Sequence, residues 1–255
     1  MDMGLKDKVV LITGGGGGIA RGIERAFATE GAKFILTDLF PGGMEAAKEE
    51  LERDFGSEVF TVIADGANED EVKAAIDAGA AHFGGRVDVL INNAQASASG
   101  LTLVQHSKED FDLAVQSGLY ATFFYMKRAY PYLKEAGGSV INFASGAGIG
   151  GNPGQSSYAA AKEGIRGMSR VAASEWGPDN INVNIVCPIV MTKALEEWRE
   201  REPEMYEKNM KAIPLGRFGD AEKDVGRVCV FLASPDASFV TGDTIMVQGG
   251  SGMKP

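Results

Sequence analysis

The sequence places three side chains with proton-transfer chemistry in one stretch, Ser145, Tyr158 and Lys162. Tyr158 and Lys162 are one helical turn apart, so a helix would hold both on one face. A tyrosine hydroxyl has an ordinary pKa of about 10, and an adjacent ammonium group in a partly dry site can lower that pKa toward neutrality. A serine that closes the preceding strand could reach the same place. The expected chemistry is acid–base transfer at an alcohol or a carbonyl.

A glycine-rich turn at residues 13–20, TGGGGGIA, follows an apolar run and precedes an amphipathic segment. Glycines such as Gly14 and Gly18 let the backbone approach a pyrophosphate closely, and a helix that starts near Ile19 would meet its charge with N–H groups. This context of strand, turn and helix predicts a dinucleotide-binding site.

Acidic residues end the next two apolar runs. Asp38 lies 20 residues beyond Gly18, where a carboxylate can accept hydrogen bonds from the adenosine ribose and would repel a 2′-phosphate. The following residues, LFPGG, supply no Arg or Lys, so we expect NAD rather than NADP as the cofactor. Asp65, with Gly66, is expected to contact the adenine. The alternative for both aspartates is a solvated strand end.

The elements that must position these residues follow from the apolar pattern. Seven short apolar runs alternate with helix-length amphipathic segments, which predicts an α/β fold with a doubly wound, Rossmann-type parallel sheet. Ser107 and Ser156 have the positions of helix N-caps, and the second of these helices should end near Trp176. No linker or repeat divides the chain, so a single domain over residues 1–255 is predicted. The runs are residues 8–13, 33–38, 58–64, 87–92, 138–144, 181–187 and 244–248.

One segment, residues 189–215, does not fit this alternation. Its scattered apolar side chains predict a lid over the substrate within the same domain. Ile189 and Trp198 are expected to contact the substrate from this segment.

The stretch INNAQASASG, residues 91–100, leaves the fourth run with amides followed by small side chains. At the carboxyl end of a parallel strand such residues widen a ligand cavity. We therefore expect Gln95 and Ser97 to contact a bulky alcohol or ketone. A merely exposed loop is the alternative interpretation.

Composition and charge exclude several classes of partner. The chain has 255 residues, 35 acidic and 25 basic side chains and a formal net charge of -10, so nucleic acid and anionic membrane surfaces would be repelled. No stretch approaches the roughly 18 apolar residues of a membrane span. Cys187 and Cys229 form no CxxC motif, and His82 and His106 are not spaced as ligands, so neither a disulfide nor a metal site is expected. We expect a cytoplasmic protein.

Together these motifs resemble the short-chain dehydrogenase/reductase family, from about Lys6 to Gly250. The resemblance implies that Tyr158 is the general acid/base, that Ser145 orients the substrate oxygen, and that Lys162 binds the nicotinamide ribose while lowering the pKa of Tyr158. The matching pieces are TGGGGGIA, Asp38, NNA at 92–94, Ser145, Tyr158, Lys162 and the stretch from Pro188 to Thr192.

The same resemblance implies further contacts along the cofactor. Asn92 and Ala94 would lie beside it, and Val190 and Thr192, which follow Pro188, would touch the carboxamide. The family also implies a homotetramer.

Four positions depart from the family pattern. Ala20 replaces the third glycine of the turn, and Gln95 and Ile189 stand where glycines are usual, which adds bulk beside the cofactor or substrate. Gly118 replaces an asparagine that anchors a proton-relay water in the family. The change Gly118→Asn is expected to leave nucleotide binding intact.

A narrower resemblance includes these departures. The segments INNAQASASG, SGLYATFFYM and VCPIVMT, with the long stretch around Tyr158, resemble the bacterial bile-acid 12α-hydroxysteroid dehydrogenases. This resemblance implies reversible oxidation of the 12α-hydroxyl of a bile acid to the 12-oxo compound, with a steroid as the small-molecule partner. The residues alone predict only a bulky secondary alcohol.

Two other functions stay open from the sequence. One is reduction of another ketone, either a different steroid position or a 3-oxoacyl thioester, although a carrier-linked substrate would need a basic docking patch. The other is a nucleotide-sensing regulator that kept the fold and lost the chemistry. Ser145, Tyr158 and Lys162 argue against the regulator, whereas Gly118 favours it.

Overall fold

A computed structural model of the protein describes residues 2–252, with the side chains of residues 193 and 194 excepted. Its centre is one parallel sheet of seven strands in the order β3-β2-β1-β4-β5-β6-β7. The doubly wound Rossmann-type prediction is confirmed. The strands are β1 (Val9–Thr13), β2 (Lys33–Asp38), β3 (Val59–Ile63), β4 (Val89–Asn92), β5 (Ser139–Phe143), β6 (Asn182–Pro188) and β7 (Thr244–Val247).

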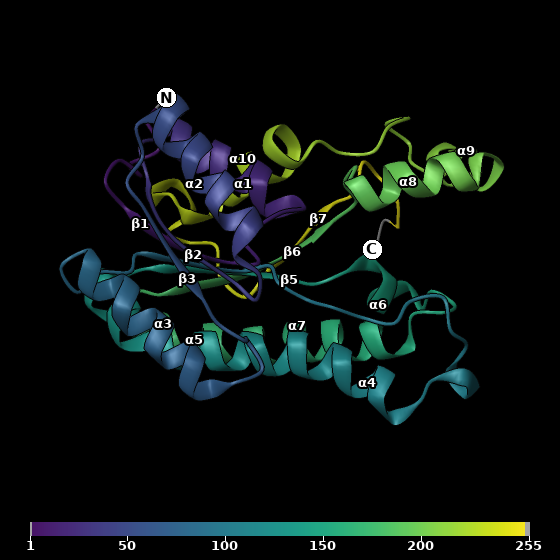
Figure 1. The fold of residues 1–255 in the computed structure, drawn as a ribbon, viewed down its shortest axis with the longest axis horizontal. Helices are drawn as coiled ribbons and strands as arrows, with labels where there is room; N and C mark the ends of the chain where they lie inside the picture. Colours follow the sequence, from purple (N-terminus) through teal and green to yellow (C-terminus); the bar gives the residue numbers. More distant parts are fainter. Residues whose placement is uncertain (1, 253–255) are drawn as a thin grey trace.

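Helices cover both faces of this sheet (Figure 1). One face carries α1 (Ile19–Thr29), α2 (Pro41–Phe55) and α10 (Arg227–Ala233). The other carries α3 (Glu69–His82), α4 (Lys108–Ala114), α5 (Ala121–Ala136) and α7 (Ser156–Trp176). The order of the strands reverses between β1 and β4, and ligands of doubly wound sheets bind at this reversal, outside the carboxyl ends of the strands.

The alternation of side chains along β1 explains the two layers. Val10 and Ile12 pack into the core beneath α1, whereas Val9 and Leu11 pack into the core beneath α3. All four side chains are buried. Because successive residues of a strand point to opposite faces, an unbroken apolar run is what a doubly covered strand needs.

The predicted helix that begins at Ser107 is present but is not regular throughout. The backbone N–H of Asp110 donates a hydrogen bond of 3.0 Å to Ser107 Oγ, as a capping box requires. After α4, residues Val115–Tyr120 form a π-helical segment, and α5 then continues the helix. The predicted helix from Ser156 to Trp176 matches α7.

The segment after β6 stands beside the carboxyl ends of the strands. It forms α8 (Lys193–Arg201) and α9 (Pro203–Lys211), on the right of Figure 1, where the short α6 (Gly146–Gly150) also lies. Aromatic contacts hold it, with ring centroids 6.1 Å apart for Trp198 and Tyr206 and 5.2 Å apart for Tyr206 and Phe218.

No helix within residues 2–252 combines the length and the apolar character of a membrane span. Across the same residues no group of His, Cys, Asp and Glu side chains has the arrangement of a metal site.

Candidate active site

The glycine turn between β1 and α1 forms a cradle without side chains. Gly14 has φ +69°, and a Cβ on it would lie 3.1 Å from Nδ2 of Asn93. A Cβ on Gly17 or Gly18 would meet nothing within 4 Å, so the turn is open on that side. Among the described residues, no side chain caps the first turn of α1, which begins at Ile19. Free N–H groups at a helix N-terminus suit a phosphate, so the turn fits the expected dinucleotide.

A cavity of about 620 Å³ runs along this turn, and the predicted residues Gly14, Gly18, Ile19, Asp38, Asp65, Gly66, Ala94, Gln95 and Thr192 line it. The carboxylate of Asp38 is held at its wall, because Oδ2 accepts from the Gly16 N–H at 3.1 Å and Oδ1 accepts from the Phe40 N–H at 3.2 Å. Among the residues that the structure describes, no Lys or Arg side chain lines this cavity. The wall of this cavity is therefore acidic at Asp38.

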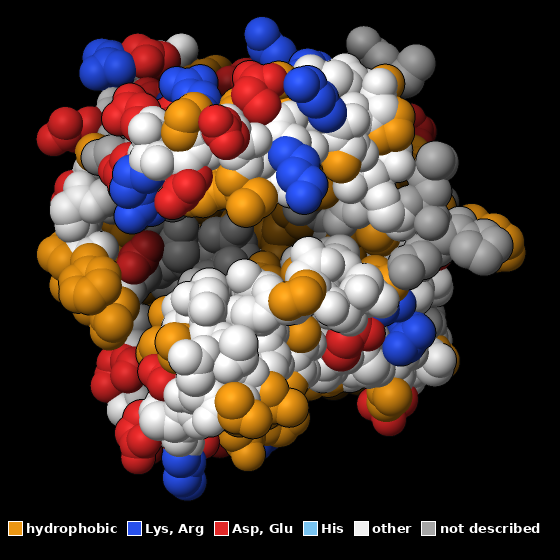
Figure 2. Space-filling model, turned by 90° about the vertical axis from the view of Figure 1, so that its right-hand side faces the viewer, with side chains coloured by type: hydrophobic (Ala, Val, Ile, Leu, Met, Phe, Trp, Pro, Cys, Tyr) orange, Lys and Arg blue, Asp and Glu red, His pale blue; other side chains and the backbone are white. Residues whose placement is uncertain are grey.

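A second cavity of about 870 Å³ adjoins the first, and Ile19, Asn93, Gln95 and Thr192 line both. Figure 2 looks onto this edge of the molecule and shows the hollow between its two halves. The predicted residues at the second cavity are Ser145, Tyr158, Lys162, Pro188, Ile189, Val190 and Trp198. We call this second cavity the substrate chamber.

The structure brings the three proton-transfer residues together as expected. Ser145 lies two residues beyond the end of β5. Its Oγ accepts from the Ala147 N–H at 3.1 Å, and it also hydrogen bonds to Tyr158. Lys162 donates from Nζ to the carbonyl oxygen of Phe143 at 2.8 Å. The same Nζ lies 5.6 Å from the centroid of the Tyr158 ring.

Burial dominates the ionisation of this group. Desolvation raises the pKa of Tyr158 above its ordinary value, although the hydrogen bond from Ser145 acts in the opposite direction. Desolvation also lowers the pKa of Lys162 from 10.5 to about 8. The expectation that Lys162 lowers the pKa of Tyr158 stays a prediction, because the net shift of the Tyr158 pKa in the chain alone is upward. The upward shift of the Tyr158 pKa and the downward shift of the Lys162 pKa have the same main cause, because burial removes hydration from the ionised form of each group.

Two of the departures from the family pattern, Gln95 and Gly118, lie next to each other in the structure. A Cβ on Gly118 would lie 2.6 Å from Cδ and from Oε1 of Gln95, so the glutamine amide fills the place of a side chain at position 118. Both Oε1 and Nε2 of Gln95 are buried, and neither has a hydrogen-bond partner among the residues that the structure describes. Gly118 lies in the π-helical segment, which faces the cofactor cavity through Ser117. An amide is thus present beside the site, but β4 and its loop supply it.

Two expected contact residues lie elsewhere. Asn92 is buried and donates from Nδ2 to Oδ1 of Asn142 at 2.8 Å, and it lines neither cavity. The next residue, Asn93, lines both cavities. Ser97 also lines neither, and its Oγ lies 3.2 Å from Oγ of Ser99.

Sequence reasoning missed a polar wall of the substrate chamber, formed by Ser99, Asn152 and Gln155. Ser99 donates from Oγ to Oε1 of Gln155 at 3.2 Å, and the Gly100 N–H donates to the Gly154 carbonyl at 2.9 Å. These contacts join two loops that are more than fifty residues apart in sequence. The only local signal was the Pro153-Gly154 turn directly before α7.

Comparison with known proteins agrees with this geometry. The profile of a family described as enoyl-(acyl carrier protein) reductase matches residues 15–252. A crystal structure of levodione reductase superposes with a TM-score of 0.91 at 34% identity, covering 96% of this chain and 98% of the other. The chain belongs to the short-chain dehydrogenase/reductase family and is an oxidoreductase.

Within that family, one relative is especially similar. The chain is 57% identical over 260 residues to the 12alpha-hydroxysteroid dehydrogenase of Clostridium sp. (strain ATCC 29733 / VPI C48-50), covering 99% of this chain and 100% of the relative. The 3-oxoacyl-[acyl-carrier-protein] reductase FabG of Thermotoga maritima is 37% identical, covering 97% of this chain and 99% of that relative.

Proposed function

We propose that this protein catalyses the reversible, NAD-dependent oxidation of the 12α-hydroxyl of bile acids to the 12-oxo form. The observation that carries the proposal is the substrate chamber of about 870 Å³, which opens onto the cofactor cavity and has Ser145, Tyr158 and Lys162 on its wall. A chamber of this volume suits a rigid polycyclic alcohol. The 57% identity to a 12alpha-hydroxysteroid dehydrogenase supports the choice of carbon 12.

In this proposal Tyr158 moves the proton. A bound nicotinamide dinucleotide supplies the acceptor or the donor of hydride. During oxidation, Oη of Tyr158 takes the proton of the substrate hydroxyl, and during reduction it returns that proton to the alkoxide oxygen. Ser145 hydrogen bonds to Tyr158 and orients the same substrate oxygen. Lys162, whose Nζ lies 5.6 Å from the Tyr158 ring, is the cation of the protein that favours the phenolate.

Gln95 takes over the amide that Gly118 lacks. Its Oε1 and Nε2 carry unused hydrogen-bonding capacity where the two cavities meet. Buried amides are costly without partners, so a water molecule or a substrate oxygen is the expected partner there. We therefore assign Gln95 the role of positioning the proton path beside Tyr158.

Cofactor choice and assembly follow from two further observations. The fixed carboxylate of Asp38, without a neighbouring described cation, supports NAD over NADP. Apolar side chains that are exposed on α4, α5 and α7 support a homotetramer in which these helices meet their counterparts. These side chains are Phe111, Leu113, Phe123 and Val171. The free, buried thiols of Cys187 and Cys229 suit the reducing cytoplasm.

A 3-oxoacyl thioester reductase is the second candidate, favoured by the similarity to FabG. The excess of acidic residues on the lid argues against this second candidate. Residues 193–211 carry six glutamates (196, 197, 200, 202, 204 and 207) against five basic residues (193, 199, 201, 208 and 211). An anionic carrier would meet no net positive surface at the chamber.

Reduction of NAD in the presence of single bile acids tests the proposed function. Deoxycholate and cholate, which carry a 12α-hydroxyl, should be oxidised, whereas chenodeoxycholate, which lacks that hydroxyl, should not. Equal rates with all three would contradict the assignment to carbon 12. Faster reduction of a 3-oxoacyl thioester than of a 12-oxo bile acid would favour the second candidate.

A further inference from the structure

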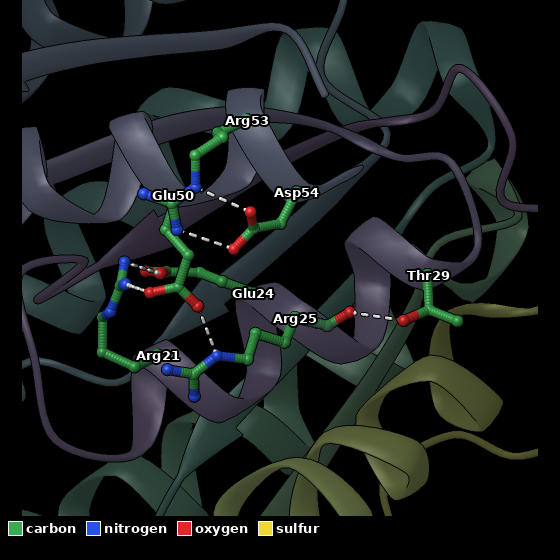
Figure 3. Close-up of polar contacts among 7 residues, drawn as sticks. All are labelled: Arg21, Glu24, Arg25, Thr29, Glu50, Arg53 and Asp54. Atoms are coloured by element: carbon green, nitrogen blue, oxygen red, sulfur yellow. Dashed lines mark hydrogen bonds and ion pairs between the residues drawn. The ribbon is translucent and has the colours of Figure 1, made fainter. Parts of the chain in front are cut away.

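A charged cluster lies between α1 and α2, close to the glycine turn (Figure 3). Its centre is Glu24, which is fully buried. Oε2 of Glu24 accepts from Nη1 of Arg21 at 3.1 Å, whereas Oε1 has no hydrogen-bond partner within the described part of the chain. Glu50 on α2 pairs with Arg21 and, at 2.6 Å, with Nε of Arg25. Glu50 thus forms ion pairs with both arginines of the cluster, whereas Glu24 accepts a hydrogen bond from Arg21.

The carboxyl group of Glu24 lies next to the glycine turn, on the side away from the cofactor cavity. A Cβ on Gly15 would lie 3.5 Å from Oε1 of Glu24 and 3.0 Å from Leu36. Gly15 does not line the cofactor cavity, whereas Gly14 and Gly16 do. The unpartnered carboxylate oxygen therefore faces the inner side of the turn whose outer side faces the cavity.

The charges around Glu24 do not stabilise its ionised form sufficiently. The groups that face it are Arg21 and Arg25 on its own helix and Glu50 on α2, while Glu222, from the segment packed against α1, acts on Arg25. Desolvation raises the pKa of Glu24 from 4.5 to about 8, because the attraction of Arg21 and Arg25 offsets only part of that cost. The carboxyl group therefore changes its protonation state near pH 8.

We propose that Glu24 couples protonation to nucleotide binding, taking up a proton when a dinucleotide phosphate binds on the other side of the glycine turn. The inference rests on the proposed nucleotide site. An ionised carboxylate below the turn and a phosphate above it repel each other through a dry layer of backbone, where charge interactions are stronger than in water. Binding of the phosphate consequently favours the neutral acid, and a neutral acid favours binding, by the same factor.

The consequence is a nucleotide affinity that depends on pH. Well below pH 8 Glu24 is neutral, so binding should be independent of pH there. Above pH 8 binding must first protonate the group, so affinity should fall, by about tenfold for each unit by which the phosphate raises the pKa of Glu24. Lys162, with a pKa lowered to about 8, titrates in the same range at the far end of the site.

Calorimetric titration with ADP separates the two groups, because ADP carries the phosphates but lacks the nicotinamide half that reaches Lys162. A phosphate has a second pKa of about 6, so ADP itself hardly titrates at pH 7.5 and above. The same titrations in two buffers with different ionisation enthalpies give the number of protons taken up. We expect uptake of a fraction of a proton, largest between about pH 8 and 9, and a weakening of ADP affinity above pH 8.

Glu24→Gln should abolish both the uptake and the pH dependence, with an ADP affinity at high pH no weaker than that of the wild type at neutral pH. Glu30→Gln, at the other end of α1, is the matched control and should retain both. Glu24→Ala serves as a second variant if the glutamine does not fold. Uptake that persists unchanged in the folded Glu24 variants, or binding of ADP without uptake in the wild type, would overturn the inference. Failure to bind either ADP or NAD at any pH would instead refute the proposed function and the inference with it.

Discussion

At the scale of single residues, local spacing predicted more of the site than distant contacts did. Tyr158 and Lys162 could be placed together because one helix carries both. The pairing of Gln95 with Gly118 could not be predicted, since the two residues are far apart in sequence and meet through a π-helical segment. A single residue also separates the expected Asn92 from the observed Asn93, because successive side chains of a strand alternate between faces.

The first prediction concerns the group that carries the proton. Tyr158→Phe should lower kcat for 12α-hydroxyl oxidation by two orders of magnitude or more, about the contribution of general acid–base catalysis, because the phenolic oxygen is lost. Nucleotide affinity, measured by fluorescence quenching, should change little. A folded variant with wild-type turnover would remove Tyr158 from the chemistry.

The second prediction tests whether the amide of Gln95 replaces a side-chain amide at position 118. Gln95→Gly should lower kcat about tenfold or more by removing the positioning amide, and Gly118→Asn alone should also be impaired because the new side chain collides with Gln95. The double variant, Gln95→Gly with Gly118→Asn, should recover activity, since one amide again fills the gap. The pH profile of kcat should recover in parallel. Strictly additive losses in the double variant would show that the two positions are independent.

At the scale of elements, strand ends and helix starts were predictable because their signals are short. The predicted runs agree with all seven strands within one or two residues, and Ser107 has the predicted cap. The π-helical segment of residues Val115–Tyr120 has no comparable signal in the sequence. The lid was predicted because residues 189–215 interrupt the alternation of apolar runs and amphipathic segments. Its Trp198 lines the substrate chamber.

The third prediction belongs to the lid. Trp198→Ala should raise KM for the bile acid several-fold with little change in nucleotide affinity, because its indole lines the substrate chamber and not the cofactor cavity. Met205→Ala is the control, since Met205 is exposed on the same lid and lines neither cavity. Initial rates over a range of deoxycholate concentrations give both constants. Equal effects of the two substitutions would argue against a lid contact with substrate.

At the scale of the whole molecule, the buried lysine of the site costs stability. Lys162 is 4% exposed, and its pKa is lowered to about 8 in the folded protein against about 10.4 in an unfolded chain. The unfolded state therefore binds more protons between pH 8 and 10, so the free energy of unfolding should rise with pH across that window. Below pH 8 the full cost is present.

The fourth prediction follows from that cost. Lys162→Met should abolish activity and yet raise the free energy of unfolding at pH 7 by about 1–3 kcal/mol, which is an upper range because the hydrogen bond to Phe143 is also lost. Denaturant unfolding at pH 7 and pH 10 measures the change. The gain should shrink at pH 10, and a variant that is less stable at both values would contradict the account.

The central claim is that the hydrogen on carbon 12 of a bile acid passes to the nucleotide beside Tyr158. Deoxycholate that carries deuterium on carbon 12 tests this directly, with the reduced nucleotide analysed by mass spectrometry after one turnover. We expect the label in the reduced nucleotide from the wild-type protein, and about a hundredfold less reduced nucleotide, or less still, from Tyr158→Phe in the same time. Reduced nucleotide without the label would show that hydride leaves another carbon, and the assignment to the 12α-hydroxyl would be wrong.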